Sequence, residues 1–193
     1  MSKYQHFKIY KPYGYLSQFI NNQTTRKNKK LLGDLYNFPD DTMAIGRLDE
    51  DSEGLLLLTT SGMMSEDVRS KEVEKEYYVQ VDGIINEQAI ALLNNGVEIG
   101  INGKKYLTKP CKAFKLDKAP GFPQRSKKIR DERHGPTCWV SITLTEGKFR
   151  QVKKMTAAVG YPTLRLVRIR IGNEFLNNLQ SGDVLEVGSF KLI

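Results

Sequence analysis

The chain has 193 residues, and 39% of them are hydrophobic, which is enough for a substantial buried core and excludes a mainly disordered protein. With 30 Lys and Arg against 22 Asp and Glu, the net charge of +8 favours a polyanionic partner such as nucleic acid, although proteins also reach this charge without one. No apolar run approaches a membrane span of about 18 residues, and the first residues lack the apolar run of a secretory signal, so we expect a cytoplasmic protein.

The first half of the chain predicts three strands. FKIYKPYG, residues 7–14, indicates a short strand that ends in a Pro-Tyr-Gly turn. The polar, basic segment 21–30 is either a surface loop or a loop that touches phosphate, and the residues leave both open. LLLLTT, residues 55–60, indicates a buried strand because turn signals bracket it. EKEYYVQVDG, residues 74–83, alternates as a half-buried strand does.

The middle of the chain predicts a helix, an arm and a strand. NEQAIALLNNG, residues 86–96, begins with an asparagine cap, ends with glycine and has the apolar spacing of an amphipathic helix. Segment 115–136 is rich in Pro, Gly and charge, which is typical of an inserted surface arm that could face RNA. Residues 137–147 return to strand alternation, and we expect Trp139 to pack in the core.

The last part predicts a helix, a strand and a hairpin. Residues 148–162 indicate a helix with one stripe formed by Phe149, Val152, Thr156 and Val159. Segment 163–172 alternates apolar and basic residues, as in a strand with one face in the core, and 183–193 indicates a final hairpin. Strands and helices that do not alternate regularly predict an α+β fold with a mixed, largely antiparallel sheet.

The most unusual segment is GRLDEDSEG, residues 46–54, which is strongly acidic within a basic chain. Asp49, Asp51, Glu53 and Gly54 occupy positions 1, 3, 5 and 6 of a calcium-loop pattern, but Thr60 stands where the bidentate glutamate belongs. Two acids so close in sequence also differ from hydrolytic carboxylate pairs, which converge from separate elements. The pattern therefore argues against both a calcium loop and a hydrolase pair.

Other catalytic groups are scarce. His6 and His134, the only histidines, lie in no nucleophile motif, and we interpret them as surface residues. Cys111 and Cys138 lie far apart, without a Cys-x-x-Cys or His-rich neighbourhood. We therefore expect reduced structural thiols, and neither a disulfide nor a metal site.

Local chemistry leaves two interpretations of the acidic segment open. In the first it is a solvated turn, capped by Ser52 or Asp51, in which Gly54 lets the chain enter the next strand. In the second, a strand-like GRLD places Arg47 and Asp49 on the same side, which serves either a reactive site or a surface ion pair. Three acids are assigned to the turn and its solvent face: Glu50, Asp51 and Glu53.

GRLDEDSEGLLLLTTSG resembles the central motif of the pseudouridine synthases that act on ribosomal RNA. Four further segments resemble motifs of that family, in the family's order: KPYG at 11–14, KEYYV at 75–79, EGKFRQVKKM at 146–155 and TLRLVRIRIG at 163–172. The likeness is greatest to the branch that modifies the large-subunit RNA. Many members have an S4-like RNA-binding domain before the catalytic domain, whereas this chain starts almost at the Lys-Pro motif. We therefore expect residues 1–193 to form a single catalytic domain.

The resemblance implies a catalytic fold with two lobes around a central cleft. It also implies isomerisation of a uridine in large-subunit ribosomal RNA to pseudouridine, without a cofactor or metal, by a monomer. The partner is then ribosomal RNA, either naked or in an assembly particle. A non-catalytic RNA-binding module is the main rival, but such a module has no need to keep Asp49, Tyr77 and Arg150 together.

The same resemblance assigns the site residues. Asp49 matches the family's essential aspartate, and the sequence leaves open whether it attacks C1′ or removes the 2′ proton. Arg150 matches the arginine that pairs with this aspartate, and Tyr77 matches the tyrosine that packs on the target base. Leu166 is the expected apolar wall of the uracil pocket, and Arg47 is expected beside the position that a flipped base vacates.

Each assignment has a simpler alternative: Arg150 could contact phosphate, Tyr77 could be an ordinary strand residue, and Leu166 could be a core residue. Phosphate contacts are expected from the basic residues within 23–30, 125–133 and 148–154. In the last segment these are Lys148, Lys153 and Lys154.

Overall fold

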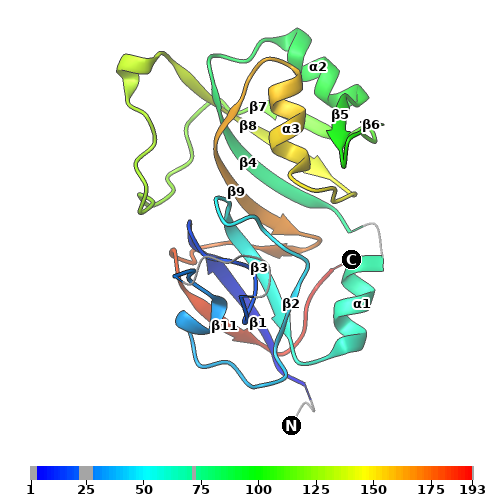
Figure 1. The fold of residues 1–193 in the computed structure, drawn as a ribbon, viewed down its shortest axis with the longest axis vertical. Helices are drawn as coiled ribbons and strands as arrows, with labels where there is room; N and C mark the ends of the chain where they lie inside the picture. The colour runs from blue at the N-terminus through cyan, green and yellow to red at the C-terminus, as the bar shows by residue number, and fades with distance from the viewer. Residues whose placement is uncertain (1–3, 22–27, 71–72, 193) are drawn as a thin grey trace. The chain divides into compact units, whose positions relative to one another are not determined.

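A computed structural model describes residues 4–21, 28–70 and 73–192 (Figure 1). Residues 22–27, the greater part of the basic loop expected at 21–30, lie outside the described residues. None of the helices in the described part of the chain is long and apolar enough to cross a membrane.

The chain divides into two compact units. The first contains the described residues up to Val73, the short segment Pro123–Lys127 and the residues from Arg168 onward. The second contains Glu74–Phe122 and Lys128–Val167. Strand β9 (Thr163–Ile171) runs from the second unit into the first, and Pro123–Lys127 is the part of the arm that belongs to the first.

The strands of the first unit form antiparallel pairs. β1 (His6–Lys11) pairs with β3 (Glu53–Thr59) on one edge and with β11 (Val184–Val187) on the other. β2 (Met43–Ile45) pairs with the second half of β3, and β10 (Glu174–Phe175) pairs with the end of β9. A 3-10 turn, η1 (Leu32–Asp34), precedes β2, and α1 (Gly62–Ser70) follows β3 and packs on β2 and β3.

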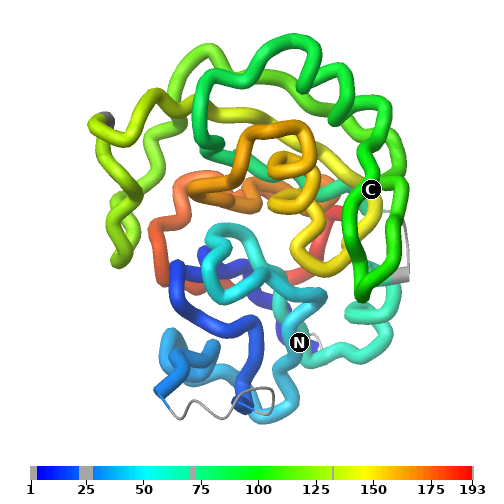
Figure 2. Tube along the Cα trace, turned by 45° about the horizontal axis from the view of Figure 1, so that its top comes forward, coloured from blue at the N-terminus to red at the C-terminus, as the bar shows by residue number. Residues whose placement is uncertain are grey.

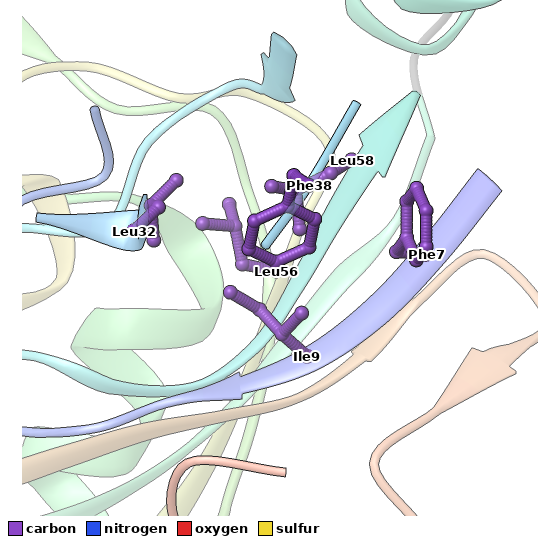
Figure 3. Packing of buried hydrophobic residues seen from close by; sticks show 6 residues of the cluster. All are labelled: Phe7, Ile9, Leu32, Phe38, Leu56 and Leu58. Atoms are coloured by element: carbon purple, nitrogen blue, oxygen red, sulfur yellow. The ribbon is translucent and has the colours of Figure 1, made fainter. Parts of the chain in front are cut away.

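The core of the first unit explains the run of leucines. All seven residues of β3 are buried because neighbouring strands flank it and side chains cover both of its faces. On one face, Leu56 and Leu58 pack with Ile9 and the rings of Phe7 and Phe38 (Figure 3). The Phe7 and Phe38 rings meet edge to face at 5.3 Å between centroids. The buried strand predicted at 55–60 is therefore confirmed.

The strands of the second unit also form antiparallel pairs, and its described residues include three helical segments. β4 (Lys75–Asp82) pairs with β8 (Thr137–Leu144), which also pairs with β7 (Lys112–Lys115). β5 (Glu98–Ile101) and β6 (Lys104–Leu107) form a separate hairpin after α2 (Glu87–Asn95) (Figure 2). A 3-10 turn, η2 (Glu132–His134), lies in the arm, and α3 (Gln151–Ala158) packs on β5 while α2 packs on β7.

Several predicted elements of the second unit are confirmed. The Asn86 side chain accepts a hydrogen bond from the Ala89 N–H at 2.9 Å, which caps α2 as expected. β4 alternates in burial as predicted: Tyr77, Val79 and Val81 are buried, and the residues between them are partly exposed. Trp139 is buried, and its ring centroid lies 5.6 Å from that of Phe122.

Three predictions about the C-terminal half are wrong in part. Phe149 lies before α3 and is 66% exposed, so the expected stripe is replaced by a buried face of Gln151, Val152, Met155 and Thr156. β9 does not alternate, because Arg165 and Arg168 are buried beside its apolar residues. The final hairpin is absent from the described residues, since β11 pairs with β1 instead.

Candidate active site

The acidic segment forms the loop between β2 and β3 in the first unit. Gly46 follows β2 with φ 71° and Gly54 enters β3 with φ 103°, both in the left-handed region that favours glycine. Between them, the Ser52 N–H donates to the Asp49 carbonyl at 3.0 Å and closes a turn. Asp49 is half-buried and Arg47 is exposed. GRLD is therefore part of a loop and not of a strand, and the placement of Arg47 and Asp49 on the same side stays a prediction.

Ser17 fixes the residue immediately before Asp49. Its hydroxyl donates to the Leu48 carbonyl at 2.8 Å and accepts the Leu48 N–H at 2.9 Å. Ser17 and Leu48 are both buried, where water has little access. The two bonds therefore satisfy backbone groups of Leu48 that would otherwise lack a hydrogen-bond partner. The sequence contains no periodic signal for this role, because the two residues are 31 positions apart.

The KPYG motif fixes the residue immediately after Asp49. The Gly14 N–H donates to the Glu50 carbonyl at 2.8 Å. Lys11 is fully buried, and its ammonium donates to the carbonyls of Pro12 at 2.9 Å, Tyr15 at 2.7 Å and Glu50 at 3.5 Å. The loop is thus held on both sides of Asp49 by the segment that follows β1.

Glu50 and Asp51 lie in the turn and are partly exposed, as predicted, whereas Glu53 differs from its predicted setting. Glu50 is partly exposed, and both of its carboxylate oxygens accept from Lys29 at 2.6 Å. Glu53 is only 1% exposed and begins β3, so its assignment to the solvent face is wrong. Its burial follows from its place in a strand that is covered on both faces.

In the second unit, Arg150 has an uncommon backbone conformation. It is the residue before α3, and its φ of 52° and ψ of 32° lie in the left-handed region. A side chain with a Cβ adopts this region at a cost of about 1 kcal/mol or more, and such residues cluster at functional sites. Its carbonyl accepts the Lys154 N–H at 3.0 Å, which starts the first turn of the helix.

Glu146 and Gln151 hold the segment around Arg150. Gln151 is buried, its amide donates to the Glu146 carboxylate at 2.6 Å, and its carbonyl oxygen accepts the Lys148 N–H at 2.9 Å. Glu146 also accepts from the Tyr106 hydroxyl at 2.5 Å and the Lys109 N–H at 2.9 Å. Burial opposes ionisation of Glu146, but these hydrogen bonds and the Lys148 charge together lower its pKa.

The three lysines of this motif differ in their contacts. Lys148 is exposed, and its ammonium lies 5.0 Å from the centroid of the Tyr106 ring. Lys154 donates to the Gly100 carbonyl at 2.7 Å and lies 5.1 Å from the centroid of the exposed Phe149 ring. Lys153 is half-buried. Their predicted contacts with phosphate stay predictions.

Tyr77 and Leu166 occupy buried strand positions in the second unit. Tyr77 is 8% exposed on β4 and lies opposite Ile142 on β8. Leu166 is 4% exposed on β9. Asp49 and Arg47 thus belong to the first unit, and the other predicted site residues belong to the second: Tyr77, Leu166, Arg150, Lys148, Lys153 and Lys154.

The basic arm contributes to a cavity of about 960 Å³ in the second unit. Arg130 and Arg133 line it together with Gln80 of β4. Arg130 forms an ion pair with Asp82, and Arg133 donates to Asp131 at 2.6 Å. The arm therefore presents arginines around a hollow, and its predicted contact with RNA stays a prediction.

His6 and the two cysteines lie away from the acidic loop in sequence and differ in their burial. His6 is 5% exposed, lies 2.9 Å from the Thr59 hydroxyl and packs on Phe190, so its interpretation as a surface residue is wrong. Burial lowers its pKa. Both cysteines are free thiols, and burial raises the pKa of Cys111 to about 11. Within the described ranges, no group of three His, Cys, Asp or Glu side chains could hold a metal.

Comparison with known families identifies the class of the protein. Residues 5–158 match the family of RNA pseudouridylate synthases, so the chain belongs to that family. A crystal structure of a pseudouridylate synthase covers 97% of this chain, with a TM-score of 0.73 and 28% sequence identity, and this chain covers 71% of it. The Cbf5 complex with Nop10 and Gar1, at 15% identity and a TM-score of 0.56, shares the fold alone. The α+β prediction is therefore confirmed.

Particular relatives are more similar in sequence. The ribosomal large subunit pseudouridine synthase E of Vibrio parahaemolyticus is 42% identical over 92% of this chain and 71% of its own length. The enzyme of the same name from Xanthomonas axonopodis pv. citri is 42% identical over 88% of this chain and 86% of its own. Synthase B of Bacillus subtilis is 28% identical over 94% of this chain and 67% of its own. The resemblance stated from the motifs is confirmed.

Proposed function

We propose that this chain is an isomerase that converts a uridine of large-subunit ribosomal RNA to pseudouridine. The observation that carries the proposal is the family match over residues 5–158, which includes Asp49, Tyr77 and Arg150. Relatives that are 42% identical over about nine tenths of the chain are named for the large ribosomal subunit, which supports the choice of RNA.

The reaction rearranges one nucleoside without changing its composition. The bond between N1 and C1′ breaks, the detached base turns, and C5 forms a new bond to C1′. C5 then loses its proton, and N1 gains one. When the bond to N1 breaks, C1′ lacks an electron pair, which is supplied either by a temporary bond to the enzyme or by loss of the 2′ proton to give a glycal, and that proton is returned when C5 bonds to C1′. An ionised carboxylate meets this need either as a nucleophile at C1′ or as the base that removes the 2′ proton.

Asp49 is the residue that supplies this carboxylate. Ser17 holds the backbone before it, and Gly14 and Lys11 hold the backbone after it. A carboxylate on such a restrained loop loses little conformational freedom when the sugar arrives, which favours reaction. Arg150 is the arginine that the family resemblance pairs with this aspartate, and its left-handed backbone is the cost of presenting the guanidinium.

Tyr77 and Leu166 form the apolar surroundings of the base. Both are buried in strands, so they can exclude water from the reacting base at little cost in side-chain entropy. Arg47, which is exposed, lies beside the position that the extruded uridine vacates. Asp49 belongs to the first unit, and Tyr77 and Arg150 belong to the second.

Basic residues supply the affinity for RNA. Lys148, Lys153 and Lys154 contact phosphates beside Arg150, and the arginines of the arm extend this contact. Binding should therefore weaken steeply as the salt concentration rises. The protein acts in the cytoplasm as a monomer on ribosomal RNA, and residues 1–193 constitute one catalytic domain.

Ribosomal RNA from a strain without this protein provides the test. Purified protein is incubated with this RNA, either naked or as precursor particles, and pseudouridine is mapped by carbodiimide modification and primer extension. We expect one new stop in the large-subunit RNA. The absence of any new pseudouridine from both substrates, with RNA binding intact, would favour a non-catalytic RNA-binding module.

A further inference from the structure

The first unit contains a pocket that the proposed reaction does not use. Its volume is about 560 Å³, within the range of small-molecule sites, and its lining includes Tyr13, Lys29, Lys30, Glu50 and Ser126. We call it the Tyr13 pocket. Its residues come from the KPYG turn, the end of the basic loop, the Asp49 loop and the arm, all within one unit.

The pocket carries more positive than negative charge. Lys29 and Glu50 neutralise one another through their ion pair. Lys30 also lines the pocket, and its ammonium lies 5.4 Å from the centroid of the Tyr15 ring. Arg125, next to Ser126 in the arm, places its guanidinium 4.6 Å from the centroid of the Tyr13 ring. Lys30 therefore adds a positive charge beyond the neutral pair, which suits an anionic ligand.

The pocket also offers a stacking surface. Arg125 covers a face of Tyr13, so the ring and the guanidinium already form a short stack to which a planar group can add. RNA bases stack on tyrosine rings and on arginine guanidinium planes when they leave a helix. An aromatic ring with cations beside it matches a nucleotide, since the base stacks and the phosphate meets the positive charge.

The pocket is linked to the Asp49 loop through the backbone. Glu50 follows Asp49 in the chain and lines the pocket, and its carbonyl accepts the Gly14 N–H at 2.8 Å. A nucleotide in the pocket therefore lies beside the loop that carries the proposed catalytic carboxylate. This position favours a neighbour of the target uridine in the same RNA over a free nucleotide.

We propose that the Tyr13 pocket binds a second nucleotide of the RNA substrate, with its base stacked at Tyr13 and Arg125 and its phosphate at Lys30. The inference rests on the proposed function, because it takes RNA as the substrate. It gives the arm a role, since the segment Pro123–Lys127 brings Arg125 and Ser126 to the first unit. The pocket selects and aligns the RNA and does not contact the reacting atoms.

Steady-state kinetics separate this role from catalysis. Tyr13→Leu and Lys30→Gln are measured with a large-subunit ribosomal RNA transcript, with Phe175→Leu and Lys191→Gln as matched controls at exposed positions of the first unit. Loss of one stacked base should raise KM about tenfold or more, with kcat within about twofold of wild type. Tyr13→Phe keeps the ring and should restore most of the affinity. An unchanged KM in both pocket variants would overturn the proposal.

Crosslinking tests the pocket independently of turnover. RNA that contains 4-thiouridine is irradiated with the protein, and crosslinked peptides are identified by mass spectrometry. A crosslink to Tyr13 or Lys30 that Tyr13→Leu weakens would support the pocket, and crosslinks confined to other segments would refute it. If wild-type protein makes no pseudouridine but crosslinks at Tyr13, the proposed function fails and the pocket stands. If it makes pseudouridine and never crosslinks there, only the pocket fails.

Discussion

Replacing Ser17 by alanine tests whether the Asp49 loop owes its position to one hydroxyl. The substitution removes the hydrogen bonds at 2.8 and 2.9 Å that join Ser17 to the carbonyl and the N–H of Leu48. Both residues are buried, so the two backbone groups lose their partner where water has little access. We expect the loop to loosen at the residue that immediately precedes Asp49.

The magnitude follows from these two bonds. Each hydrogen bond contributes about 0.5–1.5 kcal/mol, so the variant should lose about 2 kcal/mol of unfolding free energy. For a chain of this size that loss lowers Tm by about 4–8 °C, which leaves the protein folded at 25 °C. Displacement of a catalytic group by about 1 Å can cost about 100-fold, so we expect kcat to fall about 10- to 100-fold.

The assay pairs calorimetry with tritium release from RNA labelled at uridine C5. Ser61→Ala is the matched control, because Ser61 is also buried and its hydroxyl accepts the Met64 N–H at 3.3 Å beyond the far end of β3. This variant should lose about 1 kcal/mol of stability and keep its kcat. A wild-type kcat in Ser17→Ala, together with the expected fall in Tm, would show that Ser17 does not position Asp49.

Three further predictions concern the second unit. In calorimetry, the unfolding free energy of Arg150→Gly should equal that of wild type or exceed it by about 1 kcal/mol, because glycine tolerates the φ of 52°. The variant should nevertheless lose most tritium release. A lower unfolding free energy would contradict the claim that the Arg150 backbone is strained. Burial opposes ionisation of Glu146, but hydrogen bonds hold its pKa in the folded protein below the ordinary 4.5. The ionised carboxylate therefore stabilises the folded state above that pH, and this contribution is lost as the pH falls through the folded pKa. Urea unfolding of Glu146→Gln should therefore differ from wild type at pH 7 and converge with it once the pH falls below the folded pKa of Glu146, and a constant difference would contradict this. Burial raises the pKa of Cys111 to about 11, so iodoacetamide at pH 8 should leave it unmodified in native protein by mass spectrometry, and rapid alkylation would refute a shielded thiol.

The sequence predicts those elements whose burial follows a simple period. β3 and β4 match their apolar run and their alternation, and α2 matches its cap and spacing. Helix α1 escapes prediction because only Ser65 and Val68 are buried among its described side chains, so no apolar stripe marks it.

The buried charges could not be predicted from periodicity. Arg168 is 3% exposed, and its Nε donates to the Leu55 carbonyl at 2.8 Å, a contact between residues 113 positions apart. Arginines that alternate with apolar residues predict a solvent-exposed face of a strand. Arg168 is buried instead, with a hydrogen-bond partner on β3, which is distant in sequence. Glu53 is misassigned because it is the first residue of β3, in which all seven residues are buried.

The residues proposed to act on the substrate could be predicted from the sequence, but the residues that hold them in position could not. Motif resemblance selects Asp49, Tyr77 and Arg150, whereas Ser17 carries no signal in a loop without periodicity. Glu146 and Gln151 stand within a matched motif, but their mutual hydrogen bond depends on the turn that places Arg150 in the left-handed region.

Asp49→Asn tests whether the Asp49 carboxylate carries the chemistry, with Asp51→Asn as the control in the same loop. Both variants remove one negative charge and keep the size of the side chain, so their Tm and their affinity for RNA should stay close to wild type. Tritium release from labelled large-subunit RNA should be abolished in Asp49→Asn and persist in Asp51→Asn. Undiminished release by Asp49→Asn would contradict the account, because the one carboxylate assigned to the chemistry would then be dispensable.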